Sequence, residues 1–252
     1  MRVPLPAAFL ARPLAHRGYH DRKEGRIENS ASAFEASIKG VYGIELDLQL
    51  SADGVPMVFH DDTLDRLTGE GGPVSARTAA ELGAIRLWGS DDTIPSLAQV
   101  LQLVEGRVPV LIEIKDQTLT MSPTDGRLEA ATAAVLAGYR GWVALMSFNP
   151  DCIGHMARLA PELPRGLTTD QFDPVDWAPL PAETCARLRH IPAYDATQSS
   201  FISHGASDLG SARVAELQAA GATILCWTIR SPEAEAEARK IAANVTFEGY
   251  AA

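Results

Sequence analysis

The chain is poor in cysteine and has no long uninterrupted apolar run. Its 252 residues include three cysteines, Cys152, Cys185 and Cys226, which have neither the even number of a disulfide framework nor the spacing of a metal site. We therefore expect reduced, buried thiols and a cytoplasmic protein. The N-terminal residues, MRVPLPAAFLARPLAHRG, contain an apolar patch that prolines interrupt and that is too short for a signal peptide or a membrane span. Stable membrane association is not expected.

Positive charge is also scarce. Lysines and arginines number 22 against 32 aspartates and glutamates, so the formal net charge is −10. A protein that binds nucleic acid through its phosphates needs a basic face, and this composition argues against one. A small phosphate ester needs only a few local cations, so the composition does not exclude such a substrate. Hydrophobic residues make up 46% of the chain, which is enough for a sizeable core.

Several familiar catalytic and nucleotide-binding motifs are absent. The sequence has no P-loop and no G-x-G-x-x-G run, and neither Ser147 nor Thr228 lies in a G-x-S-x-G setting. A serine hydrolase is therefore not expected. The chain also lacks internal repeats, low-complexity segments and a recognisable linker, so we predict one domain over residues 1–252.

What the sequence does contain is a regular alternation of strand and helix patterns. The predicted strands cover 13–18, the hairpin at 43–62, 108–115, 142–148, 164–169, 196–203, 223–229 and 244–250. The predicted helices cover 33–38, 76–82, 97–105, 127–138, 150–159, 173–190, 209–220 and 233–242. This alternation predicts a TIM (β/α)8 barrel. Residues 61–95 fall outside it and predict a small insertion after the second strand, either over the barrel mouth or as a surface excursion without function.

The most informative stretch is GIELDLQLSADGVPMVFHDD at residues 43–62. Asp53-Gly54 predicts a tight turn between two short strands. Glu45 and Asp47 are two residues apart, so they face the same way on a strand. Folding the hairpin back brings His60 beside them, and this arrangement suits a divalent cation next to an acid/base group. The alternative is an edge hairpin with a solvated polar face.

Other polar residues fall at the predicted C-terminal ends of barrel strands, where barrel enzymes keep their chemistry. His16 and Arg17 follow the first strand. Glu113 and Lys115 share one face of an otherwise apolar strand, and such charges are costly unless they are paired or bound. They predict either a structural ion pair or a third metal carboxylate with a cation for an anionic substrate. Trp227 predicts either core packing or an aromatic floor for the substrate.

Smaller details leave further alternatives. His16 and His20 have H-x-x-x-H spacing, but Gly18 argues against a helix there, and His20 is expected in a surface loop. Asn29 or Ser30 is the expected N-cap of the next helix, and Glu28 points either at the site or at water. The other histidines, His155, His190 and His204, fall on predicted helices or loops with no partner motif.

Taken together and in order, these pieces resemble the glycerophosphodiester phosphodiesterase family, a TIM-barrel family related to the phosphatidylinositol-specific phospholipases C. The matching pieces are His16-Arg17-Gly18, Glu28-Asn29, Glu45-Leu46-Asp47, Asp53-Gly54, Val58-Phe59-His60-Asp61, Leu64 to Gly69, Ile94 to Leu97, Glu113-Ile114-Lys115, Ser147-Phe148 and Trp227-Thr228. The C-terminal end departs from the common pattern. Many members end in a Thr-Asp-x-Pro run, whereas this chain has Thr246-Phe247-Glu248-Gly249-Tyr250.

The resemblance implies a phosphoric diester hydrolase of glycerol and lipid metabolism. Its expected substrates are small glycerophosphodiesters such as glycerophosphocholine and glycerophosphoethanolamine, and its expected products are glycerol 3-phosphate and an alcohol. The implied site residues are Glu45, Asp47 and Glu113 as ligands of Mg²⁺ or Ca²⁺, His16 and His60 as the acid/base pair, Arg17 and Lys115 for the phosphate, Trp227 for the glycerol moiety, and Glu28, Asn29 and Phe148 around the site. The resemblance leaves open which histidine is the acid.

Three other functions compete with this reading. A lysophospholipase D-type enzyme would act on a lipid and would need an apolar groove at the mouth, for which the insertion offers Leu87, Trp88 and Ile94. A glycosidase would use two carboxylates such as Glu45 and Glu113, although the nearby cations and histidines suit an anion better than a neutral sugar. A barrel that binds phosphodiesters without turnover is the non-enzymatic alternative.

Overall fold

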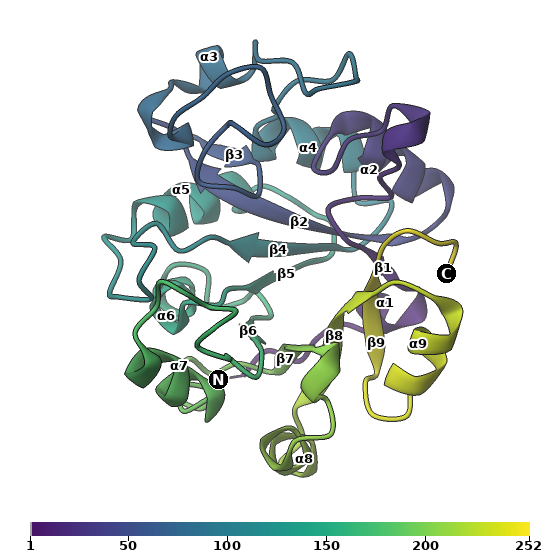
Figure 1. The fold of residues 1–252 in the computed structure, drawn as a ribbon, viewed down its shortest axis with the longest axis vertical. Coiled ribbons are helices and arrows are strands. Elements are labelled where there is room, and N and C mark those ends of the chain that lie inside the picture. The colour runs from purple at the N-terminus through teal and green to yellow at the C-terminus, as the bar shows by residue number, and fades with distance from the viewer. Residues whose placement is uncertain (1) are drawn as a thin grey trace.

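Eight parallel strands form a nearly closed barrel in the computed structural model, which describes residues 2–252 (Figure 1). The strand order is β5-β4-β2-β1-β9-β8-β7-β6, and a parallel bridge between Leu145 and Arg165 brings β5 next to β6. The barrel strands are β1 Leu14–Ala15, β2 Gly43–Leu50, β4 Val110–Ile114, β5 Val143–Met146, β6 Gly166–Thr169, β7 Phe201–Gly205, β8 Thr223–Ile229 and β9 Asn244–Phe247. The short β3, Pro56–Val58, pairs antiparallel with β2. The predicted TIM barrel is confirmed.

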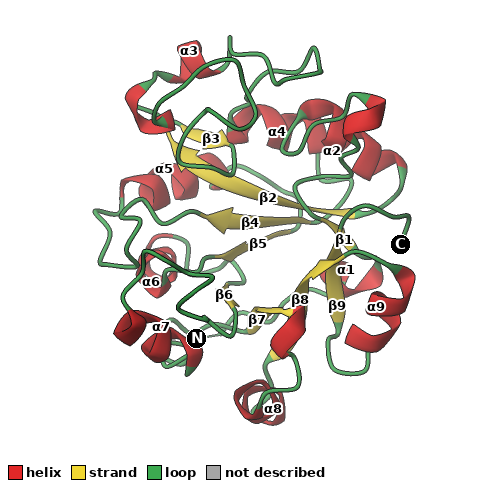
Figure 2. Cartoon of the chain, viewed as in Figure 1, coloured by secondary structure: helices red, strands yellow, loops and turns green. Residues whose placement is uncertain are grey.

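Helices alternate with the strands and surround the sheet (Figure 2). They are α1 Ala8–Ala11, α2 Ala31–Lys39, α3 Ala79–Leu82, α4 Leu97–Val104, α5 Arg127–Leu136, α6 Pro150–Leu159, α7 Ala182–Arg189, α8 Ala212–Ala219 and α9 Pro232–Ala238, with 3-10 turns at Arg22–Glu24, Val74–Ala76 and Ala206–Asp208. Ser30 caps α2 through a hydrogen bond to the amide of Ala33, and Ser96 caps α4 within a capping box.

Two predicted elements were misplaced. The segment 173–190 is helical only over α7, and residues 173–181 form a loop that Arg189 anchors by donating to the carbonyls of Gln171 and Phe172. The strand predicted at 196–203 is β7, Phe201–Gly205. Turns occupy the preceding residues because the guanidinium of the buried Arg165 binds the carbonyl of Thr197 there. His204 consequently lies in β7 and not in a helix or loop.

An apolar plug fills the lower part of the barrel. Phe9 from the unpredicted α1 packs in one cluster with Leu14, Leu111, Phe201 and Leu225, which come from four different strands. Asn244, at the start of β9, donates hydrogen bonds to the carbonyls of Phe9 and Arg12 and so holds α1 under the barrel. The charged residues Asp47 and Glu113 lie nearer the opposite end, toward which the strands run to their C-termini.

The insertion between β3 and α4 packs around its own small core, at the top of Figure 1. Leu87 and Ile94 are fully buried in that core, whereas Trp88 is 58% exposed. A lipid substrate would require these three residues to line an apolar groove. That expectation is wrong, because Leu87 and Ile94 are buried inside the insertion's own core.

Two further observations concern the chain as a whole. Within residues 2–252, no helix combines the length and the apolar character needed to cross a lipid bilayer. Cys152, Cys185 and Cys226 are all buried, unpaired thiols. Burial raises the pKa of Cys226 to about 12, so this thiol stays protonated at neutral pH.

Candidate active site

The predicted hairpin places the first acidic residues. Strand β2 runs parallel to β4, and their register sets Asp47 directly beside Glu113. Glu45 lies two residues before Asp47 and faces the same interior, as the alternation of a strand requires. One ligand oxygen from each of Glu45, Asp47 and Glu113 can be chosen so that all lie within 4.8 Å of one another. The three residues are 2%, 2% and 6% exposed.

Two cations lie against these carboxylates. The Nζ atom of Lys115 is 2.8 Å from Oδ1 of Asp47 and 2.6 Å from Oε1 of Glu113. The guanidinium Nε of Arg17 is 3.5 Å from Oδ2 of Asp47, and its backbone amide donates to Glu45. Although burial by itself would raise the pKa of Asp47, the Lys115 ammonium together with His60 and Arg17 lowers it far below its usual range.

Glu45 is in the opposite electrostatic situation. Burial raises its pKa well above the usual value, and the like charges of Asp47 and Glu113 raise it further. An additional positive charge among the three carboxylates would relieve this repulsion. Their oxygens are hard ligands, which is the donor set that Mg²⁺ and Ca²⁺ prefer. The cluster is therefore compatible with a divalent cation, and the Glu113–Lys115 ion pair, predicted as its alternative, is present as well.

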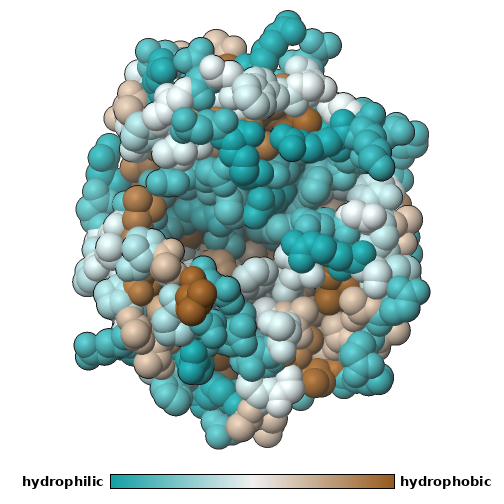
Figure 3. Space-filling view, viewed as in Figure 1, coloured by the Kyte–Doolittle hydropathy of each residue, from teal (hydrophilic) through white to brown (hydrophobic). Residues whose placement is uncertain are grey.

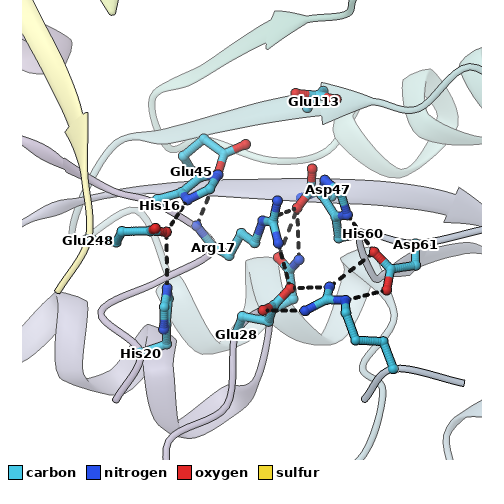
Figure 4. Close-up of polar contacts among 12 residues, drawn as sticks. His16, Arg17, His20, Glu28, Glu45, Asp47, His60, Asp61, Glu113 and Glu248 are labelled. Atoms are coloured by element: carbon cyan, nitrogen blue, oxygen red, sulfur yellow. Dashed lines mark hydrogen bonds and ion pairs between the residues drawn. The ribbon is translucent and has the colours of Figure 1, made fainter. Parts of the chain in front are cut away.

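The last strand supplies a residue that the sequence patterns did not single out. Strands β1 and β9 are parallel neighbours in which Ala15 pairs with Phe247, so the next residues, His16 and Glu248, lie side by side. Nδ1 of His16 is 2.6 Å from Oε2 of Glu248 (Figure 4). Burial lowers the pKa of His16, whereas the bond to Glu248 raises it and partly compensates. Nε2 of His20 is 3.6 Å from the same Oε2 atom of Glu248, so His20 also faces this carboxylate.

The second histidine has a matching carboxylate. Nδ1 of His60 is 2.7 Å from Oδ1 of Asp61. Arg66 from the insertion binds both Asp61 and Glu28, and Glu28 accepts a further bond from Arg17. Burial would raise the pKa of Glu28, but these two guanidinium groups lower it to about 2. Glu28 thus points at the site, and an ion-pair network ties the insertion to the loop after β1.

Asn29 was predicted as one of two possible N-caps of α2, but its side chain contacts the acidic cluster instead. Ser30 is the N-cap, while Asn29 adopts a positive φ of 57° and donates from Nδ2 to Oδ2 of Asp47 at 2.9 Å. Asn29 therefore holds one metal-site candidate directly. Phe148, which follows β5, packs edge-on against Trp227, with ring centroids 5.4 Å apart.

The same fold and residue pattern occur in known proteins. The sequence model of the glycerophosphoryl diester phosphodiesterase family matches residues 16–246. This chain belongs to the glycerophosphoryl diester phosphodiesterase family. The chain is 33% identical over 162 residues to a glycerophosphodiester phosphodiesterase of Caldanaerobacter subterraneus and 34% identical over 164 residues to an uncharacterized protein of Bacillus subtilis. These matches cover 61% and 62% of this chain and 65% of each relative, slightly less than two thirds of their length.

Solved structures of the family share the fold. An Oleispira antarctica phosphodiesterase in complex with the product sn-glycerol 3-phosphate has a TM-score of 0.73 and 23% identity, and the match covers 96% of this chain and 94% of that one. A putative glycerophosphoryl diester phosphodiesterase from Silicibacter pomeroyi has a TM-score of 0.75 and 22% identity, covering 95% and 90% of the two chains. At these identities, the likeness establishes the barrel architecture.

The departure of this family member at its C-terminal end leads to a prediction. We expect Glu248→Gln to lower kcat on the order of tenfold. The neutral amide of glutamine is a weaker hydrogen-bond acceptor than the carboxylate, so it orients the His16 ring less firmly. Removing the carboxylate also removes the interaction that raises the pKa of His16, while Arg17 and Asp47 stay in place. The acid limb of the pH–rate profile should therefore move to lower pH. Glu237→Gln, an exposed change on α9, is the matched control, and an unchanged profile in Glu248→Gln would contradict the positioning role.

Proposed function

We propose that this protein hydrolyses small glycerophosphodiesters to glycerol 3-phosphate and an alcohol, with a divalent metal, Mg²⁺ or Ca²⁺, held by Glu45, Asp47 and Glu113. The observation that carries the proposal is the pair of imidazoles beside the buried acidic cluster. His16 lies next to Glu45 and His60 lies next to Asp47, and a carboxylate holds each of them through Nδ1 (Figure 4).

The hydrogen bonds on Nδ1 suit both histidines to proton transfer. A carboxylate accepts a hydrogen bond from the Nδ1–H group of each ring, so a neutral ring has its free lone pair on Nε2 and a charged ring has a proton there. One ring can thus accept a proton while the other donates one. A phosphodiester needs both transfers, because a nucleophilic oxygen must be deprotonated and the departing alkoxide must be protonated.

The positions of the two rings divide these roles. His60 lines an open cleft of about 700 Å³ at the barrel mouth, together with Lys115 and Phe148. His16 lies at the other side of the acidic cluster, near β8 and β9, where Trp227 by family resemblance contacts the glycerol. We assign His16 as the base that deprotonates the glycerol hydroxyl next to the phosphate, which is the nucleophile that forms a cyclic phosphate ester. We assign His60 as the acid that protonates the leaving alcohol.

The reaction then proceeds in two balanced steps. In the first, the glycerol oxygen bonds to phosphorus, its proton passes to His16, the bond to the alcohol breaks, and His60 protonates the alcohol. In the second, His60 takes a proton from water, the water oxygen bonds to phosphorus, the cyclic ester opens, and His16 returns its proton to the glycerol oxygen. Arg17 and Lys115 stabilise the negative charge on the phosphate. The bound metal would add Lewis-acid stabilisation of the same charge.

The experiment that tests the function measures both products from purified protein. We expect release of choline from glycerophosphocholine and ethanolamine from glycerophosphoethanolamine, each with an equal amount of glycerol 3-phosphate. EDTA should strongly reduce the release, and Mg²⁺ or Ca²⁺ should restore it. The double variant His16→Ala/His60→Ala, purified identically, controls for host phosphodiesterases. If the wild type releases no more than this variant from any diester with either metal, the protein is a binding barrel and not an enzyme.

A further inference from the structure

The cleft beside His60 is larger than the phosphate requires. It extends from Lys115 and Glu113 outward between the start of the insertion and the loop 173–181, and its volume is about 700 Å³. Figure 3 shows hydrophilic side chains gathered around the hollow in this face of the molecule. Because His60 lines it, the cleft is where the leaving alcohol of the proposed reaction would lie.

The charge of the cleft is strongly one-sided. Among the described residues that line it, five are carboxylates and one, Lys115, carries a fixed positive charge. Lys115 neutralises Glu113, and Arg66 neutralises Asp61. The remaining carboxylates are Asp62, Asp116 and Asp176, and no described cation forms an ion pair with any of them.

These three carboxylates are held differently. Asp116 accepts hydrogen bonds from the amides of Thr118 and Met121 and from Asn149, all neutral donors that fix its position without cancelling its charge. Asp62 and Asp176 lie on opposite walls, and within residues 2–252 their side chains have no hydrogen-bond partner. The outer cleft therefore presents uncompensated negative charge from two sides.

An aromatic and apolar wall completes the cleft. The indole of Trp177 donates to Asp170 at 3.0 Å and packs against Phe172 and Phe148, with centroid distances of 4.8 and 4.9 Å. These contacts fix the ring in a loop that the sequence predicted to be helical. Met121, on the loop after β4, packs against the same apolar cluster as Trp177 and adds a polarizable apolar surface. Aromatic faces with nearby carboxylates are the surroundings that bind alkylammonium cations.

We propose that this cleft is a specificity pocket for a positively charged leaving alcohol, in which Asp62, Asp176 and Trp177 select alkylammonium head groups over neutral polyols. The proposal rests on the proposed function and narrows its substrate class. A cation gains from the unpaired carboxylates and from the face of Trp177. A neutral polyol gains from neither, and an anionic alcohol is repelled by the carboxylates.

The first experiment compares two substrates that differ in the head group. We expect kcat/KM for glycerophosphocholine to exceed that for glycerophosphoglycerol about tenfold, measured as glycerol 3-phosphate release at one metal concentration and ionic strength. Asp176→Asn and Trp177→Leu should each reduce this ratio severalfold. Asp91→Asn, a change of the same kind at a 96% exposed insertion residue outside the cleft, should leave the ratio at its wild-type value. Asp176 is exposed, so its variant carries the test if Trp177→Leu does not fold.

The second experiment does not depend on turnover. Choline chloride is titrated into the protein while the indole NMR signals are followed, with glycerol as the neutral comparison. We expect saturable shifts with choline alone and weaker binding in Asp176→Asn. If no diester is hydrolysed but choline binds in this way, the proposed function fails and the cation pocket stands. If diesters are hydrolysed with no preference for the cationic head group, or with one that Asp176→Asn leaves unchanged, the pocket proposal is overturned. It is equally overturned if neither hydrolysis nor choline binding is found.

Discussion

Replacing either His16 or His60 by alanine is expected to lower turnover of glycerophosphocholine on the order of 100-fold or more. Each ring has one nitrogen occupied by a carboxylate, at 2.6 Å for His16 and 2.7 Å for His60. The second nitrogen of each ring, Nε2, is thereby left free to accept a proton from the substrate or to donate one to it. Alanine removes the imidazole that we assign to proton transfer on that side of the acidic cluster, so the bond-making or the bond-breaking step loses its proton acceptor or donor.

The two variants should differ in the substrates that they still hydrolyse. If His60 protonates the leaving alcohol, a diester of p-nitrophenol, whose anion leaves without protonation, should regain much of its rate in His60→Ala but not in His16→Ala. His190→Ala is the matched control, because His190 lies exposed at the end of α7 and away from the site. Near-normal turnover in either active-site variant, with unchanged melting temperature, would remove that histidine from the mechanism.

Chelating the proposed divalent metal is expected to have the second largest effect. Chelation should reduce turnover about 100-fold or more, because a Lewis acid contributes several kcal/mol to stabilising charge in a transition state. The buried cluster also predicts an effect on stability that is independent of turnover. Mg²⁺ or Ca²⁺ at about 100 times its Kd would stabilise the fold by about 2.7 kcal/mol, which corresponds to a rise in Tm of roughly 5–10 °C for a chain of this size.

Glu45→Gln separates the metal site from general stability. Burial and two like charges raise the pKa of Glu45, so an uncharged amide there relieves repulsion in the metal-free protein. We expect the metal-free variant to melt no lower than the wild type, and its Tm to respond weakly to added metal. Glu129→Gln is the matched control, because Glu129 is equally buried but bonds to Thr124 outside the site. A wild-type response of Tm to metal in Glu45→Gln would exclude Glu45 as a ligand.

Local sequence signals predicted much of this arrangement. The Asp53-Gly54 turn determines that β3 folds back on β2, and strand alternation alone places Glu45 and Asp47 on one face. Ser96, a favourable N-cap residue, precedes the helix predicted from residue 97 and caps α4 in the structure. Each of these signals acts within about ten residues, and for that reason the central hairpin, the helix caps and the strand-helix alternation could be read without a structure.

Contacts between distant segments could not be read in this way. Glu248 is 232 residues from His16 in the chain, and only the closure of the barrel between β1 and β9 brings them into register. Arg66 reaches Glu28 because the insertion folds back over the loop after β1. In each case the partner is an ordinary charged residue with no local pattern, so the sequence offered no signal that distinguished it from a solvated surface group.

The loop 173–181 is a further case in which contacts between distant segments decided the structure. Its composition resembled a proline-broken helix, yet the tertiary contacts of Trp177 with Phe148, Phe172 and Asp170 hold it open as one wall of the cleft. The sequence by itself determined the strand-helix alternation and the hairpin that carries Glu45, Asp47 and His60, because these depend on the period of a strand and the geometry of one turn. The grouping of Glu113 and His16 with them was implied by the family resemblance and depends on the register of β4 and β1 in the barrel. Only the tertiary structure decided which carboxylate holds His16, what Asn29 binds and what shape the leaving-group side takes, because those outcomes depend on how the barrel closes.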